Sequence, residues 1–204
     1  MILVLVLWLC AFLYPLSSDA ADAAGPHGES LKRVEDYLNA ITTIAADFTQ
    51  VAPDGSLAGG KFFLKRPGKM RWQYDPPTPI LMIANGSQMV YYDYQLQQVS
   101  YIPIDSTLAS FLARGHISLT DPFITIEKFE ETPGMVRLTL HQADKPEAGK
   151  LTLEFSDSPL QIRNMVITDA QGQVTTVALN NAQFGAELER KMFEFEDPRK
   201  RMRN

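Results

Sequence analysis

The chain has 204 residues, of which 45% are hydrophobic and 21% charged, with 19 Lys and Arg against 24 Asp and Glu. This length fits one domain, and the net charge of -5 argues against a nucleic-acid-binding protein, which usually carries a basic domain. With one cysteine, Cys10, and three histidines, none of them four residues apart, the chain excludes a disulfide framework, a multi-cysteine zinc site and a zinc protease with His-x-x-x-His spacing.

Residues 1–20 have the pattern of a signal peptide. An apolar run over 2–14 is too short to cross a hydrocarbon core, which needs about 20 residues. Ser18 and Ala20 supply small residues at positions −3 and −1 of a cleavage site. A lipid anchor at Cys10 is the competing interpretation, but Leu9 is larger than the residue that usually precedes a lipidated cysteine. We therefore expect an exported protein whose mature form has no thiol, which suits an oxidising compartment.

The residues that follow predict a leader, one folded domain and a basic tail. Residues 21–29 are small and polar, and we expect them to be disordered; the folded domain then covers 30–197. Ser30 is the expected N-cap of an amphipathic helix, because apolar residues follow at helical spacing from Leu31 to Ile41. Residues 198–204 form a basic tail, either a solvated, frayed terminus, which we favour, or a docking site.

Between helix and tail, short segments alternate with turn residues every 8–12 positions. This spacing predicts a mainly β (α+β) protein with a large antiparallel sheet, curled into a barrel or part of one. Asn85-Gly86 is a strong hairpin signal. The predicted strands cover 47–51, 61–65, 70–74, 80–84, 88–93, 97–102, 124–129, 136–140, 150–155, 161–168 and 173–179.

One segment interrupts the strand pattern. Leu108, Phe111 and Leu112 recur at helical spacing within 106–113, and Arg114-Gly115 supplies a stop. We expect a second helix here that could cap one mouth of the curled sheet.

No catalytic constellation can be assembled from the sequence. It has no Gly-x-Ser-x-Gly elbow, Walker loop or Gly-x-Gly-x-x-Gly motif. Adjacent acids such as Glu130-Glu131 are typical of solvated charge, although a glycosidase pair with distant partners stays open. We expect no enzymatic activity, no cofactor and no metal.

The large apolar side chains of the predicted strands point instead to a ligand. Several strands carry large apolar side chains on one face, as in Leu151, Leu153 and Phe155. Each such residue could simply fill a core. Two short helices, however, cannot cover so much apolar sheet, so either the curled sheet itself or a ligand must do so. Flexible methionines suit an adaptable apolar surface, although each is more often plain filler. Seven of them follow the predicted signal peptide: Met70, Met82, Met89, Met135, Met165, Met192 and Met202.

The segment 62–75 resembles the LolA family of periplasmic outer-membrane lipoprotein carriers. Its order is Arg66-Pro67, Met70 and Trp72, then Pro76-Pro77, an apolar strand, Asn85-Gly86 and Tyr91-Tyr92-Asp93. Phe48-Thr49-Gln50 after an amphipathic helix also follows the family pattern. The similarity covers roughly 31–102 clearly and the remaining strands by pattern.

The resemblance implies an unclosed antiparallel β-barrel of about eleven strands with a helical lid over an apolar cavity. It implies a periplasmic monomer that takes triacylated lipoproteins from the LolCDE transporter and delivers them to the acceptor LolB. A carrier or sensor of another lipid or glycolipid, and an exported hydrolase acting on lipid, are the alternatives.

The resemblance also suggests roles for residues. Arg66 aligns with the arginine that latches the lid through backbone carbonyls. Pro67 and Met70 are candidate partner contacts, with Met70 where the family often has an aromatic residue. The candidate cavity residues are Phe62, Leu64, Trp72, Leu81, Ile83, Leu108, Phe111, Leu112, Val136, Leu138, Leu140 and Leu153.

Overall fold

The computed structural model describes residues 27–104 and 108–201. The predicted signal peptide and residues 21–26 of the predicted leader lie outside the described residues. Among those described, no helix is both long and apolar enough for a membrane span. The helical segments are α1 (Gly28–Ala40), η2 (Leu108–Ala113), η3 (Pro146–Ala148), η4 (Arg190–Phe193) and α2 (Pro198–Arg201).

Eleven strands form one antiparallel sheet, and neither edge pairs with the other, so the barrel is unclosed. This confirms the predicted fold class. The strands are β1 (Thr43–Val51), β2 (Leu57–Lys65), β3 (Lys69–Tyr74), β4 (Ile80–Asn85), β5 (Gln88–Asp93), β6 (Gln98–Pro103), β7 (Ile124–Thr132), β8 (Met135–Gln142), β9 (Gly149–Asp157), β10 (Leu160–Asp169) and β11 (Val174–Phe184).

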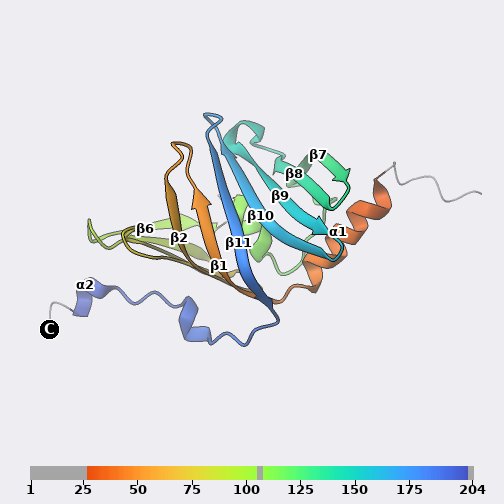
Figure 1. Ribbon diagram of the computed structural model, residues 1–204. Coiled ribbons are helices and arrows are strands. Elements are labelled where there is room, and N and C mark those ends of the chain that lie inside the picture. Colours follow the sequence, from red (N-terminus) through yellow and green to blue (C-terminus); the bar gives the residue numbers. More distant parts are fainter. Residues whose placement is uncertain (1–26, 105–107, 202–204) are drawn as a thin grey trace, which may run out of the picture.

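The strand order is β6-β5-β4-β3-β2-β1-β11-β10-β9-β8-β7. Every pairing joins strands that are consecutive in the chain except β1 with β11, which pair from Ile44↔Phe184 to Val51↔Thr176. The sheet therefore consists of two meanders, β1–β6 and β7–β11, joined along one seam. Figure 1 shows the resulting curved sheet, with α1 beside β9 and β10 and the C-terminal segment leaving the end of β11.

The helix α1 begins two residues before the predicted N-cap. His27 occupies the N-cap position without a side-chain capping bond, and Ser30 lies inside the first turn. The expectation that Ser30 is the N-cap was therefore wrong. The apolar face behaves as the periodicity predicts, since Val34 and Leu38 are fully buried. Tyr37 fixes the helix on the sheet, because its hydroxyl accepts a hydrogen bond of 3.0 Å from the Ile162 backbone N–H of β10.

The predicted second helix is present as a short 3-10 helix. The structure describes it from Leu108 to Ala113, whereas residues 106 and 107 of the prediction lie outside the described residues. Phe111, Leu112 and Ala113 are buried in the main apolar cluster. This segment therefore covers part of the curved sheet, as the sequence led us to expect.

The C-terminal segment turns back onto the sheet. It forms η4, whose Phe193 is buried, and ends in the four-residue α2. Arg199 in α2 pairs with Asp197 at 2.7 Å. The predicted basic tail is thus partly helical as far as residue 201, and residues 202–204 lie outside the described residues.

Candidate functional site

A mostly apolar cavity of about 320 Å³ lies between the two meanders. Its walls come from β1 and β3–β6 on one side and from β9–β11 on the other. Three of the apolar lining residues are methionines, whose flexible thioethers adapt to the shape of a ligand. The lining residues are Gln50, Trp72, Tyr74, Met82, Met89, Ile102, Leu151, Met165, Ile167, Thr175 and Val177.

An aromatic cluster borders this cavity. The Phe48 ring lies edge-on to Trp72, with centroids 5.1 Å apart, and edge-on to Tyr74 at 4.9 Å. Trp72 also stacks at 4.1 Å on Phe62. Edge-to-face pairs at these separations stabilise beyond simple burial. The rings meet across β2 because Gly60, which pairs with Phe48 on one side and Tyr74 on the other, has no side chain.

Of the twelve predicted cavity residues, only Trp72 lines this cavity. Most of the others belong to the buried cluster that includes Trp72, so the structure places them in the core beside the cavity. The side chain of Leu108 lies outside what the structure describes. The residues in that core are Phe62, Leu64, Phe111, Leu112, Val136, Leu138, Leu140 and Leu153.

Leu81 and Ile83 lie on the opposite face of the sheet. Their neighbours in β4 show why, since Met82 pairs with Trp72 and lines the cavity. Leu81 and Ile83 instead pack with Tyr92 and Phe195 in a separate cluster. Their assignment to the cavity was therefore wrong, because the uninterrupted apolar run of β4 carries no alternation that marks its inner face.

Sequence reasoning missed most of the lining, and two signals could have found it. The hairpin at Asn85-Gly86 joins β4 to β5 and fixes the register that pairs Ala84 with Met89. Alternation from these two residues then assigns the inner face of β4 and β5, which includes Met82. The methionines were a partial second signal, since three of the seven, Met82, Met89 and Met165, line the cavity. Gln50, Tyr74 and Thr175 carried no signal, because polar residues near strand ends are ordinary.

Arg66 connects the sheet to the segments that cover it. It follows β2, and its Nε donates to the Leu112 carbonyl of η2 at 2.7 Å. One Nη donates to the Leu38 carbonyl near the end of α1. Burial lowers the pKa of the guanidinium to about 10, so Arg66 is a cation at neutral pH. Its other Nη is buried without a partner, the one such side-chain atom among the described residues.

The covering segments are also tied to each other. Asn39 of α1 donates to the Ile117 carbonyl at 2.8 Å and accepts from the Ile117 N–H at 2.9 Å. Glu35 accepts from the Leu119 N–H at 2.6 Å. The Gly68 N–H donates to the Ala113 carbonyl at 2.6 Å. We call α1 and residues 108–119 the cover; it is held as one unit over one end of the curved sheet.

The two predicted contact residues differ in exposure. Pro67 is exposed, next to Gly115. Met70 is 1% exposed and belongs to the buried core. Met70 was therefore wrong as an exposed contact, because its strand position points it inward with Leu64, its partner in β2.

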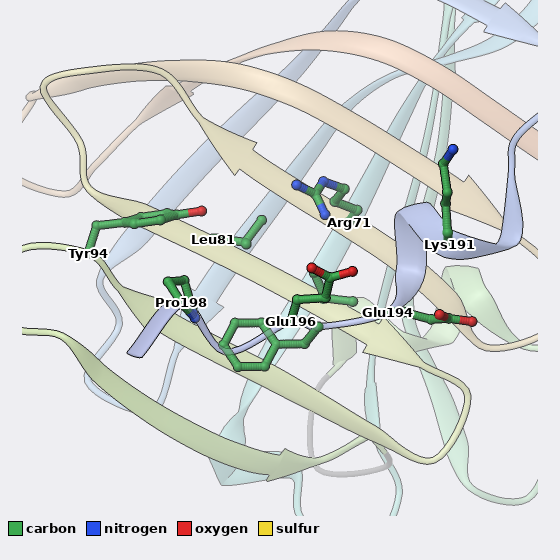
Figure 2. Close-up of a pocket in the computed structure, with 9 residues that line it drawn as sticks. Arg71, Leu81, Tyr94, Lys191, Glu194, Glu196 and Pro198 are labelled. Atoms are coloured by element: carbon green, nitrogen blue, oxygen red, sulfur yellow. The ribbon is translucent and has the colours of Figure 1, made fainter. Parts of the chain in front are cut away.

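A second hollow of about 320 Å³ lies on the outer face, between β3–β4 and the C-terminal segment. Figure 2 shows Leu81 and Arg71 on the sheet, with Glu194, Glu196 and Pro198 on the C-terminal segment. Arg71 donates to the Met192 carbonyl at 3.1 Å, which holds this segment on the sheet. Neither hollow offers a metal site, since no three His, Cys, Asp or Glu side chains in the described part of the chain could hold an ion.

The family model for the outer membrane lipoprotein carrier protein LolA matches residues 39–196, which contain the sheet, the cavity and Arg66. The chain belongs to the LolA family. Its resemblance to LolA is therefore confirmed, and it is an outer-membrane lipoprotein carrier rather than an enzyme.

Curated LolA relatives match most of the chain. A carrier protein from Methylococcus capsulatus is 31% identical over 174 residues, covering 81% of this chain and 83% of the relative. One from Legionella pneumophila is 32% identical, with 83% and 87% covered. One from Pseudomonas aeruginosa is 29% identical, with 92% and 93% covered.

A solved structure shares the fold at low sequence identity. It is an uncharacterized conserved protein from Thermus thermophilus, with a TM-score of 0.50, 13% identity, and 82% of this chain and 92% of that chain covered. At that identity the likeness concerns the fold alone.

Proposed function

We propose that this LolA-family carrier works in the periplasm and shields the acyl chains of lipoproteins in the cavity between its two meanders. The observation that carries the proposal is an apolar cavity inside the curved sheet, together with a cover over one end of that sheet whose two segments both bind the partly buried Arg66. Lipoprotein cargo follows from the family. The acyl-chain site, the periplasmic location, the monomeric state and the partners are our inference.

The energetics explain why such cargo needs a carrier. Burying one methylene is worth about 0.8 kcal/mol, so a chain of roughly 15 methylenes costs about 12 kcal/mol to expose to water. The cavity of about 320 Å³ is at the lower end of the range for small-molecule pockets, about 300–1,000 Å³. Three acyl chains therefore require the cover to move away from the sheet.

Arg66 suits a latch that opens without an energy source. Each of its two charged hydrogen bonds is worth roughly 1.5–3 kcal/mol. The buried unpaired Nη costs about 1–3 kcal/mol, and desolvation of the cation opposes closure further. The closed state is then only modestly favoured. Cargo can open the cover, and closure can assist release to an acceptor.

We place the transfer between a LolCDE-type transporter in the inner membrane and a LolB-type acceptor in the outer membrane. Pro67, exposed in the turn between β2 and β3 and next to Gly115 of the cover, is the proposed partner contact.

A release assay tests the proposal. Spheroplasts carrying labelled inner-membrane lipoproteins are incubated with the purified protein, and the soluble fraction is examined for a complex. We expect soluble lipoprotein bound one to one. If an active transporter yields no release, the carrier role fails, and mass spectrometry of lipids that copurify would test a carrier or sensor of another lipid or glycolipid.

A further inference from the structure

The polar groups of the cavity gather at one end. Gln50, Tyr74 and Thr175 are its only polar lining residues in the described part of the chain, and they come from the end of β1, the end of β3 and the start of β11. Gln50 pairs with Val177, two residues from Thr175 on the same face of β11. The remaining lining is apolar, so this end alone can recognise a polar atom of a ligand.

Packing fixes the Tyr74 and Gln50 side chains. The Tyr74 hydroxyl donates to Gln50 Oε1 at 2.7 Å, and its ring lies against Phe48. The two side chains meet across β2 because the β2 residues beneath them, Ala58 and Gly60, are small. Burial raises the pKa of the Tyr74 phenol, so it stays neutral and a hydrogen-bond donor at physiological pH.

This hydrogen bond leaves the other half of the Gln50 amide available. With Oε1 occupied by Tyr74, Nε2 is the free end, and within the described residues no protein group accepts a hydrogen bond from it. An amide N–H₂ donates hydrogen bonds and cannot accept them. The complementary group on a lipid is therefore an acceptor oxygen, and the one joined directly to an acyl chain is the carbonyl oxygen of its ester or amide linkage.

The position of the amide agrees with this assignment. The Arg66 backbone N–H donates to the Thr42 carbonyl, just before β1, whereas Gln50 is eight residues further on, roughly 26 Å away at 3.3 Å per residue. A lipid with its carbonyl at Gln50 would have its apolar chain inside the cavity and its head group outside, at the end away from the latch.

We propose that Gln50 is a specificity-determining residue that binds the carbonyl oxygen of an acyl ester or amide linkage, and that Tyr74 is the residue that positions its amide. This inference rests on the proposed acyl-chain site. It adds that the carrier distinguishes an acyl chain from an alkyl chain of equal length, and that it fixes which end of the chain remains at the rim.

The test compares ester-linked lipids with ether-linked analogues that lack only the carbonyl. Titrations use a synthetic dipalmitoyl lipopeptide and its dihexadecyl ether analogue, and the same pair as glycerol lipids without peptide. We expect the full-length protein to bind the ester lipopeptide roughly 3- to 10-fold more tightly, the range for one net hydrogen bond. A preference in both pairs assigns the site to any acyl ester, and one in the lipopeptide pair alone assigns it to lipoproteins.

Variants separate recognition from packing. Gln50→Met and Gln50→Glu remove the donor and should bring the ester-to-ether ratio to about one, with ether affinity unchanged. Tyr74→Phe should lower the same ratio without changing ether affinity, which a merely structural role would alter. Gln73→Met makes the same change on the outer face of β3 and should keep the full ratio.

Two results would overturn the inference alone: equal binding of ester and ether lipids by the unaltered protein, or a preference that survives in Gln50→Met. Failure of the unaltered protein to bind either lipid would overturn the proposed acyl-chain site as well. A variant that has unfolded loses ether binding too and is recognised by that loss. In that case Gln50→Glu, which keeps the length of the side chain, decides the question.

Discussion

Arg66 holds together parts of the molecule that are distant in sequence, and its replacement tests the latch. Arg66→Leu removes the donors to Leu38 and Leu112, so the cover should stay open more often. We expect uptake to persist and transfer to an acceptor to slow roughly tenfold, as loss of about 1.4 kcal/mol implies. The measurement is the rate at which labelled lipoprotein moves from the purified complex to acceptor-containing membranes.

Arg71→Leu is the matched control for this experiment. It also removes an arginine that donates to a backbone carbonyl, that of Met192, but on the outer face of the sheet. Transfer should be unchanged in this variant. Equal slowing in both variants, or normal transfer in Arg66→Leu, would contradict the latch.

The positions and contacts of individual side chains were the hardest features to predict from the sequence. The resemblance predicted a role for Arg66 but not its acceptors, because backbone carbonyls carry no sequence pattern. Leu81 and Ile83 were placed on the wrong face because β4 is apolar on both sides, one facing the cavity and one covered by Phe195. The partner role of Pro67 stays a prediction.

At the scale of elements, the small residues of β2 make room for the aromatic cluster. A Cβ on Gly60 would lie 2.1 Å from the Gln73 carbonyl oxygen and 2.9 Å from the Phe48 ring, whereas one on Gly59 would meet only the Phe48 carbonyl at 3.2 Å. We expect Gly60→Ala to lower the free energy of unfolding by about 2–3 kcal/mol and Gly59→Ala by less than about 1 kcal/mol. Urea denaturation measures both, and similar losses would contradict the close packing described.

The two parts of the cover are joined by hydrogen bonds from α1 to residues 117–119. Asn39→Ala leaves the part-buried Ile117 N–H and C=O without their partner. We expect it to lower the free energy of unfolding by about 1–3 kcal/mol. Lys32→Ala breaks an exposed pair with Asp36 on the same helix and should leave the free energy of unfolding nearly unchanged, because such pairs are screened by solvent. A loss no larger than that of Lys32→Ala would show that the Asn39 contacts are weak.

Strands were easier to predict than side-chain contacts, because period-two alternation and turn residues can be read from a short stretch of sequence. All eleven strands were expected, although β1 and β2 each begin four residues before their predicted starts. Boundaries failed where tertiary pairing decides them. β11 runs to Phe184, five residues beyond the prediction, because pairing with β1 continues through the polar residues Asn180 and Gln183.

At the scale of the whole molecule, the cavity between the meanders can be tested by quenching of tryptophan fluorescence. The chain has two tryptophans, Trp8 and Trp72, and Trp72 lines the cavity. We expect a lipid brominated on its acyl chain to quench most of the Trp72 emission, obtained as the difference between the protein and its Trp72→Phe variant. The unbrominated lipid is the control. Intact Trp72 emission at saturation would place the chains elsewhere.

The seam between β1 and β11 has a consequence for how the protein is made. Because synthesis runs from the N-terminus, the first meander is complete long before β11 exists, and β1 then has an unpaired edge. Such an edge is a template for aggregation. The seam also joins strands more than 120 residues apart by the register Ile44↔Phe184 to Val51↔Thr176, which is the kind of contact that slows folding. The edge of β1 in a nascent chain therefore needs protection until β11 has been synthesised. A protein that carries lipoproteins thus itself depends on protection while it is being made.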